Sequence, residues 1–463
     1  MTSFLTSMDP DYDTERTGYN RTVDHEPTVV VPAACVEDVV AAVHYATAHG
    51  LDVAVQATGH GPSRSADGAV LITTSRMDGI TIDPLARTAR IEAGVRGGAL
   101  VRAAAEYGLA PLNGSSPEVG VISFHLGGGI GILGRSLGWA VDHVRALEVV
   151  TADGVLLRVT ATEETELFWA LRGGGKGTLG VVVALEIDLH PVARLYGGGM
   201  HFAAAGAERV LTTWAQWTQT VPEAMGSSAL LIRMPDLPVL PEALRGRYLV
   251  HLRFAFTGSA AQGEQLVQPF RELGPVTDTV AGMPYSAVGS IHAEPTTPVP
   301  FHARNTMLAS IDKAAVAELL RHAGPDAYAP YLIELRLMGG ALSRPGAVPS
   351  ALARRDGAFV LYAGAVAEPE QVPAVHAAYD RLFAAMAPWS TGGVCVNFLS
   401  GPDVTAAQLA TGYLPGDVDR LAAIKRGVDP GDLFRTHHGR GVAVTPGTGR
   451  PSENPSPAGP GTA

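Results

Sequence analysis

The stretch Leu51-Asp-Val-Ala-Val-Gln-Ala-Thr-Gly-His-Gly61 shows how the N-terminal half of the chain is built. Its apolar first part is typical of a buried strand, and its glycines predict a tight turn directly after that strand. Residues 37–50 before it have apolar side chains at helical spacing, acids in the first turn and Gly50 where a helix would stop. His60 lies in the turn with an unhindered ring, although a solvent-facing loop histidine is the ordinary role of such a residue.

Strands and helices continue to alternate around this turn up to about residue 195. Strand patterns cover residues 68–73, 79–83, 88–93 and 178–189, helical patterns cover 98–107 and 166–175, and a hairpin pattern covers 146–159. A glycine-dense segment at 120–138 interrupts them. We therefore expect residues 25–195 to form one α/β domain.

The pattern changes after residue 195, where longer amphipathic strands alternate with alanine-rich helices. The strand patterns fall at residues 228–234, 247–256, 331–338 and 358–366. Their alternation predicts one antiparallel sheet in a second domain, residues 196–390. Residues 391–440 return to short elements, and residues 445–463 are rich in Pro, Gly and Ser, which predicts a disordered tail.

Composition limits the classes of protein to consider. With 463 residues the chain exceeds what one hydrophobic core usually serves, so two domains, or three at most, are expected. A net charge of −11 opposes binding to nucleic acid or anionic lipid. The two cysteines, Cys35 and Cys395, are too few for a disulfide framework, and the first residues lack the order of a secretory signal, which favours a reducing cytoplasm. No apolar window is long enough to predict a membrane span.

Two glycine motifs and a histidine pair are weak evidence when taken alone. Gly129-Ile-Gly131-Ile-Leu-Gly134 has the G-x-G-x-x-G spacing that lets backbone amides approach a pyrophosphate, but the acidic residue that a nicotinamide site needs is missing, since Glu148 lies in a predicted strand. Residues 173–178 lack the Gly-Lys-Ser/Thr order of a phosphate loop. His437 and His438 have no carboxylate or thiol spaced to complete a metal site, so no metal is expected.

Several separated segments together resemble one family, in the right order. These segments are Gln56–Gly61, Asn113–Val121, Leu126–Gly131, Val149–Gly154, Leu167–Gly175, Leu179–Val183, Met338–Ala341, Val396–Phe398, Arg420–Lys425 and Asp429-Pro430. In this combination the chain is similar to the FAD-linked oxidases of the vanillyl-alcohol-oxidase/PCMH superfamily, in the berberine-bridge-enzyme-like branch of bacterial secondary metabolism. The resemblance implies an α+β fold: a two-part PCMH-type FAD-binding domain at 25–195, a substrate domain with an antiparallel sheet covered by helices at 196–390, and a segment at 391–440 that returns to the FAD domain.

The same resemblance implies how FAD is held. Residues Gln56–Gly61 would pass under its diphosphate, with glycine amides facing the anionic oxygens. His60 falls where these proteins bond a ring nitrogen to the flavin 8-methyl carbon. Many relatives make a second bond from a cysteine where this chain has Ser116, so a single covalent link and a lower flavin potential than in a doubly bonded relative are expected. The implied FAD-binding residues are Gln56, Ala57, Thr58, Gly59, His60, Gly61, Gly114, Ser115, Ser116, Gly120, Ser123, Gly129, Gly131, Val182 and Asn397.

The catalytic residues are harder to assign. The family's Tyr-x-Asn pattern is Cys395-Val-Asn397 here, so a phenolic group is absent at that position. In Tyr331-Leu-Ile-Glu-Leu-Arg-Leu-Met338, Glu334 and Arg336 share one strand face. If the apolar face meets helices, Glu334 would line the cavity above the flavin as general base, its pKa raised by enclosure or lowered by Arg336. The alternative is a solvated strand face with an ion pair.

The resemblance implies an FAD-dependent oxidase that takes a hydride from a small natural-product or sugar-type substrate and passes the electrons to O2, giving H2O2. One alternative is a flavin-dependent oxygenase or oxidative cyclase of secondary metabolism. A second alternative is a non-catalytic flavin- or drug-binding protein, which the missing Cys and Tyr would favour.

Overall fold

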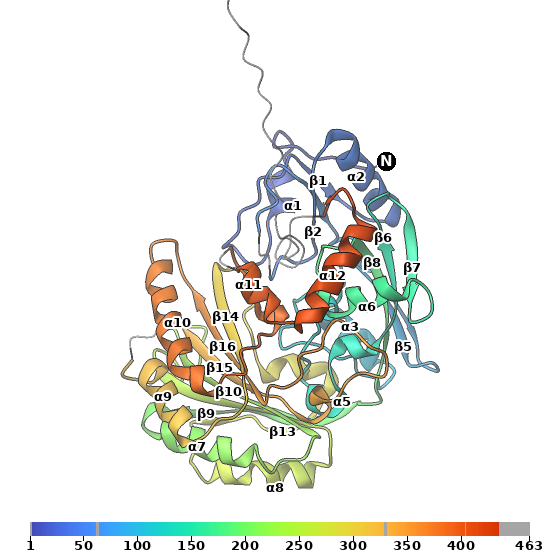
Figure 1. The fold of residues 1–463 in the computed structure, drawn as a ribbon. Coiled ribbons are helices and arrows are strands. Elements are labelled where there is room, and N and C mark those ends of the chain that lie inside the picture. The colour runs from blue at the N-terminus through green and yellow to red at the C-terminus, as the bar shows by residue number, and fades with distance from the viewer. Residues whose placement is uncertain (1, 62–63, 328–330, 403, 435–463) are drawn as a thin grey trace, which may run out of the picture.

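The computed structural model describes residues 2–61, 64–327, 331–402 and 404–434 (Figure 1). Two smaller sheets and their helices share one hydrophobic core, and a large third sheet forms a second core with its own helices. The predicted disordered tail at 445–463 and the pair His437-His438 lie outside the described residues. Within the described ranges, every helix is too short or too polar to traverse a lipid bilayer.

The smallest sheet carries the histidine turn. Its parallel strands, in spatial order, are β1 (Val29–Pro32), β3 (Val70–Thr73) and β2 (Val53–Gln56). Helix α2 (Val36–His49) contributes buried side chains to the same core and ends at Gly50, whose φ of 65° is the left-handed conformation that glycine adopts readily. Because β2 ends at Gln56, the turn that follows leaves the sheet at its carboxyl edge, where parallel sheets commonly bind ligands.

A five-stranded antiparallel sheet completes the first core. Its order is β4 (Ile80–Asp83), β5 (Thr88–Glu92), β8 (Val181–Asp188), β6 (Val144–Val150) and β7 (Leu156–Thr160). The helices of this half are α1 (Tyr12–Arg16), α3 (Gly97–Ala105), α4 (Val121–Leu126), α5 (Gly134–Leu137) and α6 (Thr165–Gly174). The predicted strands, helices and hairpin of this half are confirmed, with ends that differ by a few residues.

The large sheet belongs to the middle of the chain, and its neighbouring strands are antiparallel. Its order is β12-β9-β11-β10-β15-β16-β14, with β13 paired to β9. The strands are β9 (Arg194–Ala203), β10 (Met225–Arg233), β11 (Tyr248–Phe256), β12 (Thr277–Asp278), β13 (Ala281–Pro284), β14 (Phe301–Leu308), β15 (Leu332–Leu337) and β16 (Phe359–Val366). All four predicted strands are present as β10, β11, β15 and β16, and the predicted antiparallel sheet is confirmed.

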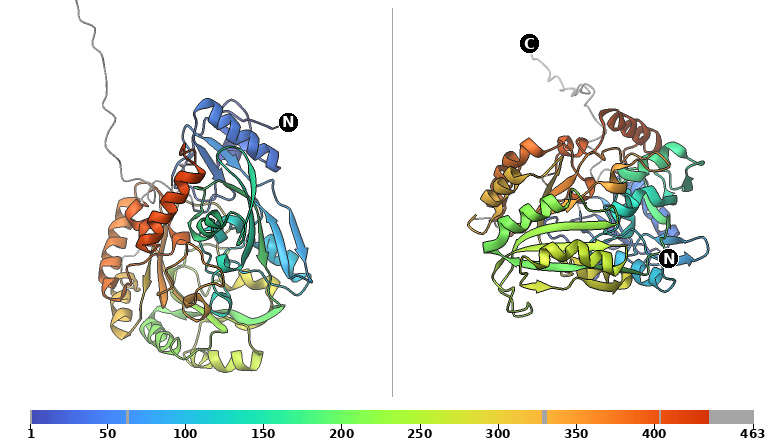
Figure 2. Two further views of the ribbon diagram at one scale, coloured as in Figure 1. Left: turned by 45° about the vertical axis from the view of Figure 1, so that its right-hand side comes forward. Right: turned by 90° about the horizontal axis from the view of Figure 1, so that it is seen from below.

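Helices cover one face of this sheet, as Figures 1 and 2 show. They are α7 (Ala207–Trp217), α8 (Ala260–Arg271), α9 (Lys313–Ala323) and α10 (Val372–Met386). In β15, Ile333 and Leu335 join the core under these helices. Glu334 and Arg336 therefore lie on the opposite face, where they meet residues of the first half of the chain, and the predicted alternation of β15 is confirmed.

The last described segment lies against the first core. It contains α11 (Ala406–Ala410) and α12 (Pro415–Val428). The Tyr413 hydroxyl donates to the Gly173 carbonyl at the end of α6 (3.0 Å), and the Val53 amide at the start of β2 donates to the Leu433 carbonyl (2.9 Å). The C-terminal segment thus supports the sheet that carries the histidine turn.

Candidate functional site

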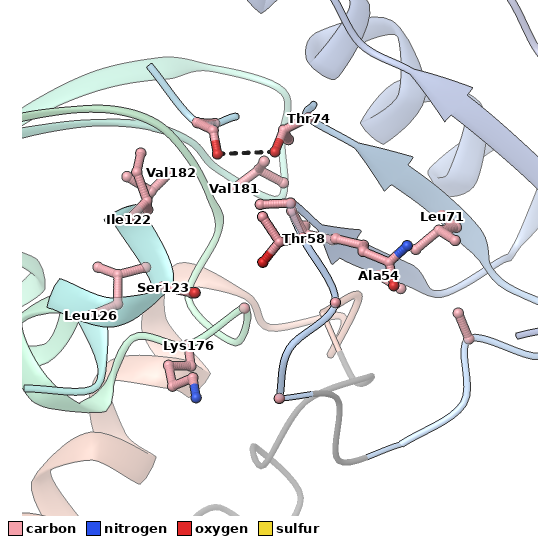
Figure 3. Close-up of a pocket in the computed structure, with 18 of the residues that line it drawn as sticks. Ala54, Thr58, Leu71, Thr74, Ile122, Ser123, Leu126, Lys176, Val181 and Val182 are labelled. Carbon is pink, nitrogen blue, oxygen red and sulfur yellow. Dashed lines mark hydrogen bonds between the residues drawn. The ribbon is translucent and has the colours of Figure 1, made fainter. Parts of the chain in front are cut away.

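A pocket opens where β2 ends (Figure 3). About 920 Å³ of atom-free space lies within it, open solvent at its mouth included. Its wall includes the end of β2 with its turn (54–61), residues of α4 (Ile122, Ser123 and Leu126) and the loop that leads into β8 (Lys176, Gly177 and Gly180–Val182). The pocket therefore lies between the two sheets of the first core.

The turn at residues 56–61 forms part of the wall of this pocket. The carbonyls of Thr58 and Gly59 accept hydrogen bonds from the amides of Tyr19 and Asn20 (both 2.9 Å). Among the described residues, no hydrogen bond is donated by an amide of residues 57–61. Gly59 has a φ of 68°, and a Cβ there would lie 2.5 Å from the Gly18 Cα, so only glycine fits. Unpaired amides in a glycine turn suit an anionic group.

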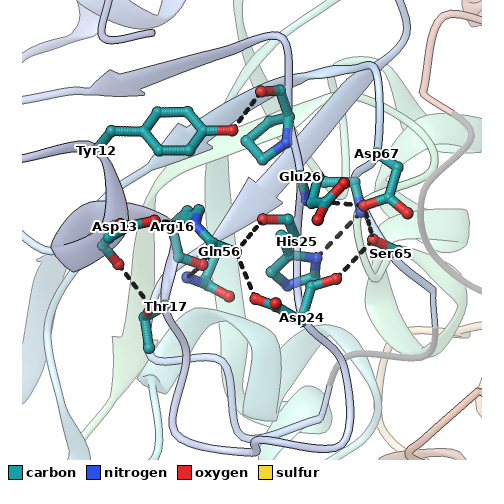
Figure 4. A network of polar contacts seen from close by, with 12 residues as sticks. Tyr12, Asp13, Arg16, Thr17, Asp24, His25, Glu26, Gln56, Ser65 and Asp67 are labelled. Atoms are coloured by element: carbon teal, nitrogen blue, oxygen red, sulfur yellow. Dashed lines mark hydrogen bonds and ion pairs between the residues drawn. The ribbon is translucent and has the colours of Figure 1, made fainter. Parts of the chain in front are cut away.

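A network of hydrogen bonds and ion pairs in the N-terminal segment holds the chain on both sides of this turn (Figure 4). Arg16 pairs with Asp13 (2.7 Å) and Asp24 and donates to the His25 carbonyl (2.6 Å). The Gln56 amide group donates to the Arg16 carbonyl (3.3 Å). The His25 Nδ1 accepts from the Ala66 amide (3.0 Å), so the chain before and after the turn is tied to one strap, residues 12–28.

His60 lines the pocket as a largely buried, uncharged ring. Its imidazole stacks on Tyr19, and its Nδ1 lies 2.8 Å from the Thr58 hydroxyl. Burial, aided by the Arg96 guanidinium, lowers the pKa of His60 to about 4. Its Nε2 is buried and has no hydrogen-bond partner. His60 is therefore neutral at physiological pH, the state in which a ring nitrogen is nucleophilic.

Lys176 is a pocket residue that sequence reasoning missed. Figure 3 shows its side chain on the α4 side of the pocket. Its Nζ lies 3.8 Å from where a Cβ of Gly61 would stand, and its Cδ lies 2.9 Å from the equivalent point at Gly127. Burial lowers the pKa of Lys176 to about 8. In the sequence, residues 173–178 were considered only as a possible phosphate loop. Lys176, a cationic residue within that glycine-rich segment, was the signal that could have pointed to an anion site.

The structure brings eight of the predicted FAD residues into the pocket wall. These are Gln56, Ala57, Thr58, Gly59, His60, Gly61, Ser123 and Val182. Gly120 lies directly behind them, since a Cβ there would be 3.3 Å from the Ala57 Cβ. These residues come from three separate segments that the fold assembles around one space.

The other predicted FAD residues, all within the described ranges, lie outside the wall of this pocket. Asn397 donates to the Phe124 carbonyl (2.7 Å), and its Oδ1 lies only 1.9 Å from where a Gly127 Cβ would stand. Gly114 and Gly129 pack against the Phe124 ring, Ser115 is half-buried, and the buried Ser116 accepts from the Glu118 amide (3.3 Å). Gly131 lines a second cavity on the inner face of the large sheet.

That second cavity contains a buried cluster of charges. The Glu334 carboxylate accepts hydrogen bonds from Arg336 (3.0 and 3.2 Å) and from Arg253 of β11 (3.2 Å). All three residues are at most 9% exposed. The His292 Nδ1 lies 3.9 Å from Glu334 Oε1. A solvated strand face with an ion pair, the alternative for β15, does not describe this enclosed cluster.

Electrostatics fix the charge of each group in the cluster. Burial acts to raise the pKa of Glu334, but Arg336 and Arg253 outweigh it and hold that pKa far below its ordinary value. Burial lowers the pKa of His292 well below its ordinary value, so this ring is neutral. Glu334 is therefore an ionised acceptor with low basicity.

Two further groups lie near this cluster. Tyr362 of β16 stands directly across from Glu334 in the sheet, and burial raises its pKa well above the ordinary value, so it is a neutral phenol. Cys395 is buried, and burial raises the pKa of its thiol to about 11. Arg336 and Lys176 both act electrostatically on that thiol, so it connects the cluster with the pocket. Tyr362 therefore places a phenol beside the cluster, with its ring centroid 5.0 Å from that of Phe398.

The residues of the pocket fit FAD. The unpaired amides of the 57–61 turn and the Lys176 ammonium would hold the diphosphate charge, and the unpartnered Nε2 of His60 points to a group that the chain itself does not supply.

Comparison with known proteins agrees with this geometry. Residues 27–160 match the FAD binding domain family. The chain is 28% identical to (R)-6-hydroxynicotine oxidase of Paenarthrobacter nicotinovorans over 89% of this chain and 90% of that protein. Among solved structures, 6-hydroxy-D-nicotine oxidase from Arthrobacter nicotinovorans superposes with a TM-score of 0.83 at 24% identity, covering 95% of this chain and 97% of that one. Xylooligosaccharide oxidase from Myceliophthora thermophila superposes with a TM-score of 0.81 at 21% identity, covering 96% and 98%. Residues 27–160 thus match an FAD binding domain, and over most of its length the chain is similar in sequence and fold to FAD-linked oxidoreductases.

Proposed function

We propose that this protein is an FAD-linked oxidoreductase of the vanillyl-alcohol-oxidase/PCMH superfamily, in its berberine-bridge-enzyme-like branch. It would act as an oxidase that removes a hydride from a small natural-product or sugar-type substrate and passes the electrons to O2, giving H2O2. The observation that carries the proposal is the pairing of a glycine turn bearing neutral His60 with a buried charged cavity on the facing sheet. When bound, FAD would supply the redox chemistry: it accepts the hydride and is reoxidised by dioxygen. The names of two similar proteins, a hydroxynicotine oxidase and a xylooligosaccharide oxidase, support an oxidase acting on a small molecule.

The chain's own residues would orient the substrate. Glu334, an ionised carboxylate of low basicity, would accept a hydrogen bond from a donor group of the substrate. Arg336 holds that carboxylate in place through two hydrogen bonds. Tyr362, opposite Glu334 and protonated, donates to a substrate oxygen or nitrogen.

A single covalent bond between His60 and the flavin 8-methyl carbon is part of the proposal. The neutral ring, its buried unpartnered nitrogen and its fixed stacking on Tyr19 support it. Forming the bond removes one hydrogen from the imidazole and one from the methyl group, and dioxygen takes up the two electrons. Ser116 has no thiol, so a second bond is not expected there.

Two measurements test the proposal. Acid-precipitated protein should stay yellow and carry a flavin mass on the peptide that contains His60, whereas a His60→Ala pellet should lose its flavin to the supernatant. With a turned-over substrate, H2O2 release should equal substrate consumption. Oxygen incorporation without stoichiometric H2O2 would favour the oxygenase or cyclase instead, and a colourless protein that takes up no added flavin would refute the proposal.

A role in secondary metabolism and a cytoplasmic location are the remaining parts of the proposal. The first is supported by the resemblance to the family branch alone, and the second by the scarcity of cysteine. Both stay predictions.

A further inference from the structure

The cavity on the inner face of the large sheet is small and rich in hydrogen-bond donors. Arg253, Arg336 and His292 line it, and Ile130–Ile132 of the glycine-dense segment close it from the other side. Its volume is about 30 Å³. Since one water needs roughly 10–15 Å³ of such space, the cavity has room for about two oxygen-sized groups.

Both arginines have donors that nothing in the described part of the chain uses. Each guanidinium donates a hydrogen bond to Glu334 from a terminal nitrogen. The buried Nε of Arg253 and the buried Nε of Arg336 have no hydrogen-bond partner. The buried His292 Nδ1 also lacks one. Buried donors are normally satisfied, so three unpartnered nitrogens around one space indicate a missing acceptor.

The buried side chains around the cavity carry a net charge of one positive unit. Arg253 and Arg336 carry two positive charges, and buried Glu334 balances one of them. Glu294 also acts on both arginines, but its side chain is 36% exposed and water screens it. His292 is neutral. A group with a single negative charge would balance the buried charges.

We propose that this cavity binds a carboxylate of the substrate, so that the enzyme oxidises a small organic acid. Two oxygens match the volume, one negative charge matches the excess, and the unpartnered guanidinium Nε groups are charged donors of the kind that bind carboxylates. The inference rests on the proposed oxidase function, because it assigns the ligand of this cavity to the substrate.

Ligand binding tests the inference without turnover. Isothermal titration calorimetry on the purified holoenzyme would compare benzoate with the neutral isostere benzamide at matched ionic strength. We expect benzoate to bind at least about tenfold more tightly, because hydrogen bonds to charged groups are the stronger class. Equal affinity for the two probes, or no binding of benzoate, would overturn the inference.

Variants with opposite charge changes locate the binding site. Arg253→Gln and Arg336→Gln should lose the preference for benzoate, and Glu334→Gln should strengthen it because one competing negative charge disappears. Arg145→Gln is the matched control, since Arg145 also pairs with a carboxylate, Asp188, but at an exposed position. A preference that survives both arginine changes would place benzoate elsewhere and refute the site.

Should the glutamine variants fail to fold, Arg253→Lys and Arg336→Lys keep the charge and lose the fork of donors. They should bind benzoate less tightly than wild type and still more tightly than benzamide, and unchanged benzoate affinity in both would count against the site. Failure of the oxidase proposal would appear separately, as absence of H2O2 release while carboxylate binding persists.

Discussion

The imidazole of His60 stacks on the ring of Tyr19, with centroids 3.9 Å apart and planes inclined by 8°. Tyr19 belongs to the strap, and its hydroxyl donates to the Pro295 carbonyl of the second half of the chain (2.8 Å). The ring that we expect to carry the flavin is therefore oriented by a residue that also contacts the facing sheet's domain.

Removing this stacking partner should slow flavin attachment. An aromatic pair is worth about 0.5–1.5 kcal/mol beyond its buried area, so Tyr19→Ala should reduce the rate of covalent incorporation by roughly two- to tenfold. Tyr19→Phe keeps the ring and is the control. The measurement is the fraction of flavin that stays with acid-precipitated protein over time after FAD is added to apoprotein, and equal rates for Ala and wild type would contradict the role of Tyr19.

Lys176 should contribute to FAD affinity through its charge. In the His60→Ala background, where flavin binds reversibly, Lys176→Met should weaken FAD binding by about tenfold or more, whereas Lys176→Arg should change it little. Lys313→Met, at an exposed position on α9, is the matched control. Quenching of flavin fluorescence reports the affinity, and an unchanged Kd for Lys176→Met would show that the cation does not face the bound cofactor.

Acid should destabilise the fold before its carboxylates are protonated. Burial lowers the pKa values of His125, His190 and His201 to about 4. The unfolded chain binds these protons near pH 6.5, so the free energy of unfolding should fall as pH drops from about 6.5 to 4, by up to about 1.4 kcal/mol per pH unit for each histidine. His143, whose pKa is raised, works in the opposite direction.

Urea unfolding at several pH values measures this slope. His190→Phe keeps a ring against His143 and removes one of the titrating groups, so its slope should be smaller by up to one proton. A free energy of unfolding that stays constant between pH 6.5 and 4.5 would contradict the prediction.

The buried pair Lys425–Asp429 should matter more for stability than the exposed pair that joins Arg420, also on α12, to Glu166 on α6. Asp429 also accepts from the amides of Leu433 (2.8 Å) and Phe434 (2.9 Å). Asp429→Asn leaves the buried ammonium only the exposed carboxylate of Asp432 (3.5 Å) as counter-charge and should cost about 3 kcal/mol. Glu166→Gln should cost at most about 1 kcal/mol. Chemical unfolding of both variants decides, and equal losses would contradict the difference in burial.

Local patterns in the sequence predicted the elements that hold the site. The apolar run before Gln56 and the glycines after it predicted β2 and its turn, because both signals depend on neighbours in the chain. The alternation in β15 placed Glu334 and Arg336 on one face for the same reason. The eight predicted residues that line the pocket came from the resemblance, and their roles toward FAD stay predictions.

The partners of Glu334 were not predictable in the same way. Arg253 of β11 reaches it only because the sheet places β15 beside β10, an order that the chain does not follow. Tyr362 reaches it because β16, the next strand in the chain, pairs with β15 in the register that sets the two residues opposite each other. A signal did exist for Arg253: in Tyr248–Phe256, His251 and Arg253 alternate with apolar residues just as the charges of β15 do. The strap gave no such signal, since its role depends on contacts with residues far along the chain.

The strap joins the two halves of the molecule through hydrogen bonds to both of them. Beside Tyr19, Asn20 exchanges hydrogen bonds with the backbone of Phe301 at the start of β14 (2.8 and 3.1 Å), while its own amide holds the Gly59 carbonyl. Three consecutive residues, Tyr19 to Arg21, thus connect the histidine turn by hydrogen bonds to the edge of the large sheet and the loop before it. A shift of the sheet edge relative to the histidine turn would therefore act on Tyr19, and through its stacking on the orientation of the His60 ring.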